Sequence, residues 1–214
     1  AMDSMVNHYT ASKRLRHDDA YTPDGKAGAR PDYAVTVYTK ILKEIYPDIP
    51  VIIGGIEASL RRLTHYDYWK DCLMPSVLVT SGADYLCYGM GERPMLSLTK
   101  GIENGWNRHR MQAIPQIAVF NTGAWKEKEG VLVLHSFEEC QKDKYKFAEN
   151  FHFIETHANM MHPDTIIEPV ADGYVRINPP YPTATTEEMD SFWDLPFTKL
   201  PHPRYKGKRI PAYD

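Results

Sequence analysis

Apolar side chains first recur at helical spacing after Pro31. They stand three or four residues apart, as one face of a helix requires, at Ala34, Val37, Tyr38, Ile41, Leu42 and Ile45. Proline suits a first helical turn and disrupts a helix interior, so this pattern predicts a helix between Pro31 and Pro47. Residues 51–53 form a continuous β-branched run, typical of a buried parallel strand, and Gly54 and Gly55 follow it directly.

The succession of helix, strand and glycine turn then repeats. The predicted elements are a helix from about Ala58 through Leu63 toward Trp69, an apolar stretch of uncertain type at 75–81, a strand at 85–88, a helix at 93–104 and a strand at 114–120. Gly89, Gly91 and Glu92 stand at the carboxyl end of the second strand. This alternation indicates a doubly wound parallel sheet. Right-handed crossovers would place both glycine turns at its carboxyl edge, where such folds bind ligands.

Beyond Gly130 the pattern changes. It predicts a helix at 137–160, a β-hairpin with strands at 165–168 and 174–177, a proline-rich connector at 178–182, a short helix from Thr186 and an extended tail. The predicted fold class is therefore α/β: a partial doubly wound parallel sheet followed by a helix and a β-hairpin. The corresponding division is a polar loop at 1–30, an α/β domain at 31–130, an extension at 131–193 and a linker at 194–214.

The first 30 residues are polar, lack apolar periodicity and end in a turn-rich stretch at 22–28. A segment of this length without a pattern is either a functional loop or disordered. We take His8 and Arg14 as its candidate ligand contacts.

Composition narrows the class of protein. Of the 214 residues, 43% are hydrophobic and 25% charged, which is ordinary for a globular chain. No run approaches the roughly 18 apolar residues that span a bilayer, and the N-terminus lacks a signal-peptide pattern. The formal net charge of −3 gives no general reason to expect nucleic acid as a partner, so any basic groove would be local.

The three cysteines, Cys72, Cys87 and Cys140, are widely spaced and form neither CxxC nor CxxxCxxC. This spacing argues against a disulfide framework and against a zinc or iron–sulfur site built from this chain alone. We expect all three to be reduced thiols that are buried or half-buried, which indicates the cytoplasm.

Two groups of residues could contact a ligand, and each group also has a purely structural interpretation. The glycine turns could let backbone approach a ligand, or could serve only as turns. The segment 61–69 holds Arg61, Arg62 and His65 among aromatic residues. Arginine pairs bind phosphate or carboxylate, but the same segment could be an amphipathic helix with solvated arginines.

Other chemistry has less support. His152, His157 and His162 are spaced by five residues, which places successive rings about 140° apart on a helix and disfavours a shared metal. The HExxH order is absent, and no GxSxG elbow supports a hydrolase triad. We therefore assign neither a metal ligand nor a catalytic residue.

Long and unusual strings run through the chain, among them Ile-Ile-Gly-Gly-Ile-Glu-Ala-Ser-Leu-Arg-Arg at 52–62, His-Tyr-Asp-Tyr-Trp at 65–69 and Tyr-Gly-Met-Gly-Glu-Arg at 88–93. Further strings lie at 2–10, 13–16, 18–23, 194–203 and 207–213. In these strings the chain resembles the YgiQ-like family of radical S-adenosylmethionine (SAM) proteins, over essentially its whole length.

The resemblance implies a longer polypeptide in which this chain precedes the radical SAM domain, its expected partner. A CxxxCxxC motif beyond Asp214 would hold a [4Fe–4S] cluster that binds SAM, and strands upstream of Met2 would complete the sheet. The chain itself would hold no cofactor. Its α/β part is similar to a cobalamin-binding-type, Rossmann-like domain, with the two glycine turns at the ligand edge. The DxHxxG string that supplies a cobalt ligand is not present, so bound cobalamin is not expected.

The resemblance favours an accessory domain that shapes or covers the substrate site of a radical SAM enzyme of unknown substrate. One alternative is a nucleotide- or RNA-binding module that uses the basic residues at 13–16, 61–62 and 204–209; another is a packing domain without a ligand. The candidate ligand-binding residues are His8, Arg14, Gly54, Gly55, Glu57, Arg61, Arg62, His65, Gly89, Gly91 and Glu92.

Overall fold

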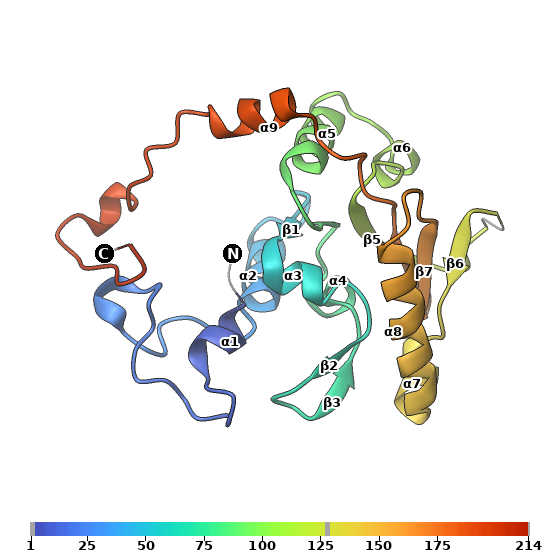
Figure 1. The fold of residues 1–214 in the computed structure, drawn as a ribbon, viewed down its shortest axis with the longest axis horizontal. Coiled ribbons are helices and arrows are strands. Elements are labelled where there is room, and N and C mark those ends of the chain that lie inside the picture. Colours follow the sequence, from blue (N-terminus) through green and yellow to red (C-terminus); the bar gives the residue numbers. More distant parts are fainter. Residues whose placement is uncertain (1–2, 127–128, 214) are drawn as a thin grey trace.

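A six-stranded sheet forms the centre of the computed structural model, which describes residues 3–126 and 129–213 (Figure 1). Its strands, in spatial order, are β1 (Ile52–Gly54), β4 (Tyr85–Cys87), β5 (Ile117–Thr122), β8 (Gly173–Ile177), β7 (Thr165–Val170) and β6 (Val131–Val133). The pairs β1–β4 and β6–β7 are parallel, and the other three pairs are antiparallel. The sheet is therefore mixed.

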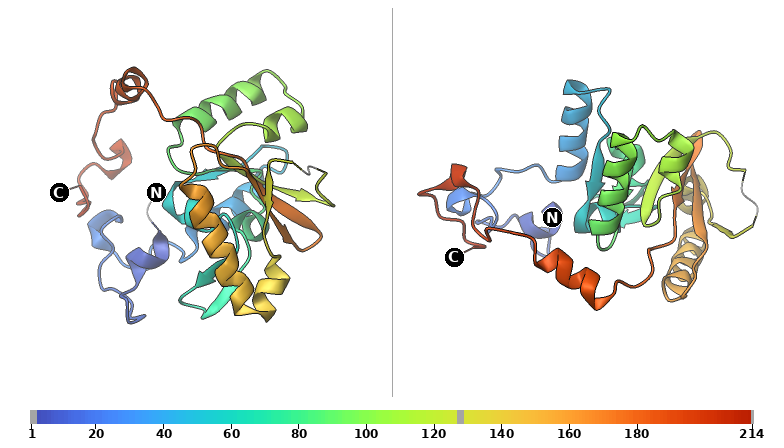
Figure 2. Two further views of the ribbon diagram at one scale, coloured as in Figure 1. Left: turned by 45° about the vertical axis from the view of Figure 1, so that its right-hand side comes forward. Right: turned by 90° about the horizontal axis from the view of Figure 1, so that it is seen from above.

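Helices cover both faces of this sheet, as Figure 2 shows from two directions. One face carries α2 (Ala34–Ile45), α3 (Gly55–Leu60), α4 (Val77–Ser81), α7 (Phe137–Lys142) and α8 (Lys144–Ala158), and the other carries α5 (Glu92–Glu103) and α6 (Arg108–Gln112). Successive residues of a strand face opposite sides, so Leu86 belongs to the first core and Cys87 to the second. The predicted α/β class and the two predicted glycine-terminated strands are confirmed.

The parallel direction predicted for the third strand is wrong, because β5 pairs with β4 in the antiparallel direction. That strand occupies 117–122 rather than 114–120, and it begins where β4 ends, with Ile117 opposite Cys87. The reason is the second helix of the connection: α5 leads away from β4, and α6 follows it before β5 begins. Gln116 enters β5 with a left-handed φ of 62°.

The predicted helix from Ala58 toward Trp69 is wrong beyond residue 60. After α3 the chain forms a separate two-stranded hairpin, β2 (His65–Asp67) and β3 (Cys72–Met74). The Asp67 carboxylate accepts hydrogen bonds from the backbone N–H groups of Trp69 and Lys70, both at 3.0 Å, and so closes the turn. Because this hairpin lies outside the main sheet, Cys72 is exposed, contrary to the expectation for all three thiols.

The predicted long helix at 137–160 consists of two helices. Asp143 is extended, with φ −137° and ψ 107°, and its side chain caps α8 by accepting from the backbone N–H of Tyr145. The apolar stretch at 75–81 contains the short helix α4, which Ser76 caps. The predicted hairpin is β7–β8, and β8 pairs with β5, so the sheet includes strands from both sides of the boundary predicted near residue 130.

An N-terminal and a C-terminal segment of the described chain contact each other. The N-terminal segment (residues 3–33) holds the unpredicted helix α1 (Ser4–His8) and the short helix η1 (Pro23–Gly25). The C-terminal strap (residues 178–213) holds α9 (Thr186–Trp193) and η2 (Pro203–Tyr205), and returns to the N-terminal segment (Figure 1). The backbone N–H of Asp24 donates to Arg209 O at 2.7 Å, and that of Ala212 donates to Ala20 O at 2.8 Å.

Helix α2 exposes its apolar stripe. Its fully buried residue is Thr39, and Lys43 reaches Asp84 at 2.6 Å, so the helix packs through a side rotated away from the stripe. The exposed apolar side chains on and just after α2 are Val37, Tyr38, Ile41, Leu42, Ile45, Tyr46 and Ile49. The periodicity therefore predicted the helix, while the face that packs in this chain is a different one.

Candidate functional site

The two predicted glycine turns lie side by side. Parallel pairing puts Gly54 opposite Cys87, so both turns leave the same carboxyl edge of the sheet. Gly55 and Gly89 have left-handed φ values of 84° and 65°, which favour glycine. A Cβ on Gly54 would lie 3.3 Å from the backbone oxygen of Cys87, so the close approach of β1 to β4 also favours glycine there.

The second turn is partly occupied by the protein's own side chain. Gln116 Nε2 donates to the backbone oxygens of Tyr88, at 2.9 Å, and Met90, and a Cβ on Gly89 would lie 3.3 Å from that nitrogen. Gly91 and Glu92 begin α5, and a pocket of about 240 Å3 lies between this turn and the strap. The turn after β4 is thus held by Gln116, the residue that directly precedes β5.

Three predicted ligand contacts instead hold the N-terminal segment. Arg61 forms an ion pair with Asp3. The buried Glu57 carboxylate accepts from the backbone N–H groups of Ser4, at 3.2 Å, and Val35, at 3.0 Å. His8 belongs to this segment and is only 4% exposed, so burial removes Glu57 and His8 from easy reach of a ligand, whereas Arg61 lines a pocket of about 290 Å3 beside α2.

His8 belongs to a buried polar network. Its Nδ1 is 2.9 Å from Asp32 Oδ1, and its Nε2 is 3.5 Å from Asp19 Oδ2. Burial tends to raise the pKa of Asp19, but hydrogen bonds from Tyr21 N–H, Arg30 and Asn7 outweigh it and hold that pKa below its usual value. The network gives the pattern-free segment a fixed structure through polar contacts.

Arg14 stands apart from the other predicted residues. It lies in a tight loop, where the backbone N–H of Thr10 donates to Arg14 O at 2.8 Å. The loop contacts the β2–β3 hairpin, because Tyr68 Oη donates to Ala11 O at 2.7 Å. The Arg14 side chain is exposed and pairs with none of the described residues.

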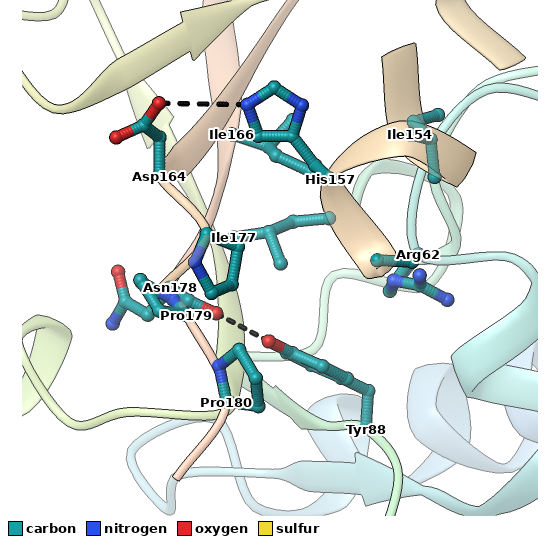
Figure 3. A pocket seen from close by; sticks show the side chains of 12 residues that line it. Arg62, Tyr88, Ile154, His157, Asp164, Ile166, Ile177, Asn178, Pro179 and Pro180 are labelled. Carbon is teal, nitrogen blue, oxygen red and sulfur yellow. Dashed lines mark hydrogen bonds and ion pairs between the residues drawn. The ribbon is translucent and has the colours of Figure 1, made fainter. Parts of the chain in front are cut away.

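The remaining candidates, Arg62 and His65, line a groove between the sheet and α8. The first pocket of this groove, the Arg62 pocket, has a volume of about 160 Å3 (Figure 3). Its walls come from α8, from the residues around β7 and β8, and from Tyr88 just after β4; they are Arg62, Tyr88, Ile154, His157, Ala158, Pro163, Asp164, Ile166, Ile177, Asn178, Pro179 and Pro180. At its rim His157 Nε2 lies 3.5 Å from Asp164 Oδ2.

Arg62 and Tyr88 meet in this pocket. The guanidinium carbon of Arg62 lies 5.2 Å from the centre of the Tyr88 ring, a cation–π arrangement. Burial raises the pKa of the Tyr88 hydroxyl to about 12, so it stays protonated and donates to Asn178 O. Burial also lowers the pKa of Arg62. The pair forms a fixed, positively charged wall.

The second pocket, the Glu168 pocket, has a volume of about 300 Å3 and shares Arg62 and Ile154 with the first. Glu168 is 1% exposed and accepts from the backbone N–H of Thr64 at 2.9 and 3.1 Å. Burial raises the pKa of Glu168 to about 7 and lowers that of His65. A carboxyl that titrates near neutrality can donate or accept a proton, although structural groups also show such shifts.

Sequence reasoning missed Tyr88, Glu168, His157 and Asn178 as site residues. A signal existed for two of them. Tyr88 separates a buried strand from a glycine turn, and Glu168 is a carboxylate within an otherwise apolar strand. The other two reach the groove only because α8 and the start of the strap pack across the sheet.

The thiols do not fit a set of cluster ligands. Burial raises the pKa of Cys87 and of Cys140 to about 11, and both therefore stay protonated, whereas a cluster binds thiolates. Cys72 lies on the separate hairpin. Within residues 3–126 and 129–213, no group of three or more His, Cys, Asp or Glu side chains is arranged to hold a metal ion.

Comparison with known proteins identifies the family. The model described as radical SAM N-terminal matches residues 1–214. The chain belongs to the radical SAM N-terminal family. Relatives that match this whole chain include UPF0313 proteins of Porphyromonas gingivalis (52% identical over 218 residues) and Bacteroides thetaiotaomicron (50% over 226), and the UPF0313 protein YgiQ of Escherichia coli (37% over 267).

This radical SAM N-terminal chain covers 34%, 36% and 36% of those three relatives, so it spans about a third of their length. The predicted YgiQ-like resemblance is confirmed. No solved structure matches the chain. None of the helices in the described ranges has the length and apolar character that a bilayer crossing requires.

Proposed function

We propose that this chain is the accessory N-terminal domain of a radical SAM enzyme, and that it shapes or covers the substrate site of a cluster-binding domain in the same polypeptide. The observation that carries the proposal is the family match over all 214 residues, in relatives about three times as long. In the longer polypeptide, a [4Fe–4S] cluster and SAM would supply the radical chemistry. Residues of this chain would bind and enclose the substrate.

The arrangement of the chain supports an enclosing role. The glycine turns and the groove lined by Arg62 and His65 offer backbone and polar groups beside one end of the sheet. The stripe on α2 and the apolar side chains of the strap, such as Phe197 and Leu200, offer surface for further polypeptide to cover. We take the rest of the same polypeptide as the occupant, because about two thirds of each relative lies outside this chain.

Cobalamin is not part of the proposal. The DxHxxG string is absent from this sequence. Gln116 also occupies the space beside Gly89, one of the two turns that a cobalamin-binding-type domain would offer to the ligand.

The test uses the full-length UPF0313 protein of Porphyromonas gingivalis and a chimera in which this chain replaces the matching third. After anaerobic reconstitution with iron and sulfide, both are expected to show a [4Fe–4S] spectrum and to release 5′-deoxyadenosine from SAM and dithionite. This chain alone is expected to do neither. If the reconstituted full-length protein neither shows a cluster nor cleaves SAM, the radical SAM assignment is overturned.

The covering role has its own readout. A version of the same protein that lacks this region is expected to lose its cluster faster to an iron chelator, provided that it still binds the cluster. Equal rates of loss in the two proteins would overturn the covering role and leave the family assignment intact.

A nucleic-acid module is the second candidate. The strap joins residues 209 and 212 to residues 20–24 by backbone hydrogen bonds, so the basic residues at 204–209 lie against the N-terminal segment that also holds the basic residues at 13–16. The third basic segment contributes less, because Arg61 is paired with Asp3 and Arg62 is half-buried. An RNA titration at several salt concentrations tests this second candidate. Saturable binding whose affinity falls steeply with salt would support a nucleic-acid module, because phosphate contacts cause such a loss. We expect no saturable binding.

A further inference from the structure

Arg62 is a half-buried cation without an anionic partner among the residues that the structure describes. Its Nη1 donates to Ser59 O at 2.7 Å, whereas Nε is buried without a hydrogen bond. Arg62 forms no ion pair with any carboxylate of the described ranges; the acid that lines the same pocket, Asp164, lies beside His157. Removing a charge from water is unfavourable unless a partner replaces the water. The ring of Tyr88 replaces only part of that hydration.

One nitrogen of this guanidinium remains able to donate to a ligand. Among the described residues, Nη1 donates to Ser59 O and Nη2 has no hydrogen-bond partner, whereas Nε is enclosed by protein atoms. Nη2 can donate to an oxygen of a carboxylate or a phosphate, and the positive charge of the guanidinium attracts either group. The geometry therefore selects an oxyanion.

Beyond the guanidinium the Arg62 pocket is mainly apolar. Its walls include the aromatic face of Tyr88, the rings of Pro179 and Pro180, and the side chains of Ile154 and Ile177 (Figure 3). A volume of about 160 Å3 admits a small ring or branched chain. Neither the family match nor the names of the relatives assigns a ligand to these residues.

We propose that the Arg62 pocket binds a small oxyanion, a carboxylate or a phosphate, carried on an apolar body that lies against Tyr88, Pro179 and Pro180. The oxyanion accepts a hydrogen bond from Nη2 of Arg62 and lies beside the positive charge of the guanidinium. The site requires only residues of this chain, so it stands or falls independently of the function proposed above.

The experiment is a titration of the 214-residue chain followed by the NMR signals of its backbone amides. The probes are benzoate, phenyl phosphate and inorganic phosphate, with benzamide as the uncharged counterpart of benzoate. We expect benzoate or phenyl phosphate to shift signals around the Arg62 pocket saturably, and benzamide to leave them unchanged. Benzoate binding identifies a carboxylate site, and phenyl phosphate binding a phosphate site.

Variants separate the guanidinium of Arg62 from general charge. Arg62→Gln is expected to weaken binding about 30-fold or more, because it removes a buried charge partner. Arg62→Lys keeps the charge and loses the Nη2 donor, so it should weaken binding by a smaller factor. Arg14→Gln is the matched control, since that arginine is exposed and unpaired among the described residues, and should change nothing.

A further variant guards against loss of folding. Ala158 is exposed at the end of α8 and lines the pocket, so Ala158→Trp should block the pocket while leaving Arg62 intact. It should abolish binding without changing the thermal midpoint greatly. The proposal is overturned if neither organic anion binds saturably, or if the Arg62 and Ala158 variants bind like the unaltered chain. Inorganic phosphate binding as tightly as phenyl phosphate would overturn the apolar half of the site.

Discussion

Gly173 shows how one residue fixes the sheet. It opens β8 opposite Thr122, and a Cβ at this position would lie 2.0 Å from the backbone oxygen of Asn121. That oxygen belongs to the neighbouring strand and cannot move away without disturbing the β5–β8 pairing. Glycine is therefore required by a close approach of two backbones.

Gly173→Ala is expected to lower the free energy of unfolding by about 3 kcal/mol, as overpacking of a rigid neighbour does. Gly91→Ala is the control, because its φ is −84° and its added Cβ would have no neighbour within 4 Å. The control should stay within about 0.5 kcal/mol of the unaltered chain. Urea denaturation followed by circular dichroism measures both. Equal losses in the two variants would contradict the close approach.

Glu168 predicts a pH dependence of stability. Burial raises its pKa from 4.5 to about 7 in the folded chain, so between these values the folded state binds more protons than the unfolded state. The stability that this proton provides is fully present below pH 4.5 and is lost as the pH rises through about 7. At 1.36 kcal/mol per pKa unit the loss is roughly 3 kcal/mol.

Glu168→Gln keeps an oxygen acceptor for Thr64 and removes the titration. Its free energy of unfolding, relative to the unaltered chain, should therefore increase between pH 5 and pH 8. Glu44→Gln, at an exposed position on α2, should show no such trend. The measurement is urea denaturation at several pH values, and parallel curves for Glu168→Gln and the unaltered chain would refute the raised pKa.

At the scale of elements, the apolar stripe of α2 is not the face of the helix that packs against the rest of the chain. Ile41 and Ile45 are 45% and 58% exposed, although their spacing is that of a core-facing stripe. Ile41→Lys with Ile45→Lys should therefore change the free energy of unfolding of this chain by less than about 1 kcal/mol. It should also reduce self-association, measured by sedimentation, because it breaks an exposed apolar patch.

Thr39→Lys is the matched substitution on the packed side of the same helix, where Thr39 is buried. It should be strongly destabilising, since it buries a charge. If the double lysine variant loses as much stability as Thr39→Lys, then the stripe is packed in solution, and its availability to further polypeptide is refuted.

The elements show what the sequence could predict. Local signals sufficed for β1 and β4, which are apolar strands that end in glycine turns, and for α2 and α5. They failed at the β2–β3 hairpin, where the turn depends on hydrogen bonds of the Asp67 side chain. The direction of β5 depends on α6, because the connection from β4 to β5 contains two helices. A local sequence pattern does not show at which edge of the sheet such a connection ends.

The candidate site, too, could be predicted from the sequence only in part. The position of the glycine turns followed from strand order alone. The contacts of Glu57 and Arg61 could not be predicted from strand order, because their partners lie in the N-terminal segment, which is polar and has no apolar periodicity. The groove needed contacts between residues far apart in sequence, such as Thr64 with Glu168 and Tyr88 with Asn178. Only the folded chain brings these together.

At the scale of the whole molecule, the strap is fixed at its ends and open in the middle. Arg93 pairs with Glu188 of α9 and also donates to Pro182 O, and the far end bonds to the N-terminal segment. Between these anchors, the backbone N–H groups of Phe197, Leu200, Arg204, Tyr205 and Lys206 donate to residues two or three positions away. Leu195, Phe197 and Leu200 are exposed. Such a stretch opens locally with little loss of packing.

Chymotrypsin is therefore expected to cleave this chain after Phe197 before it cleaves after Phe151. The two side chains are similarly exposed, at 63% and 60%, but Phe151 lies within α8, which must first unfold locally. Mass spectrometry of a time course identifies the order of cuts. In the chimera with the longer relative, the cut after Phe197 should slow markedly, because the proposed cluster-binding domain covers the strap. Equal rates in the chain and the chimera would mean that the strap remains uncovered, and the accessory domain would then have to contact its partner through α2 or the groove instead.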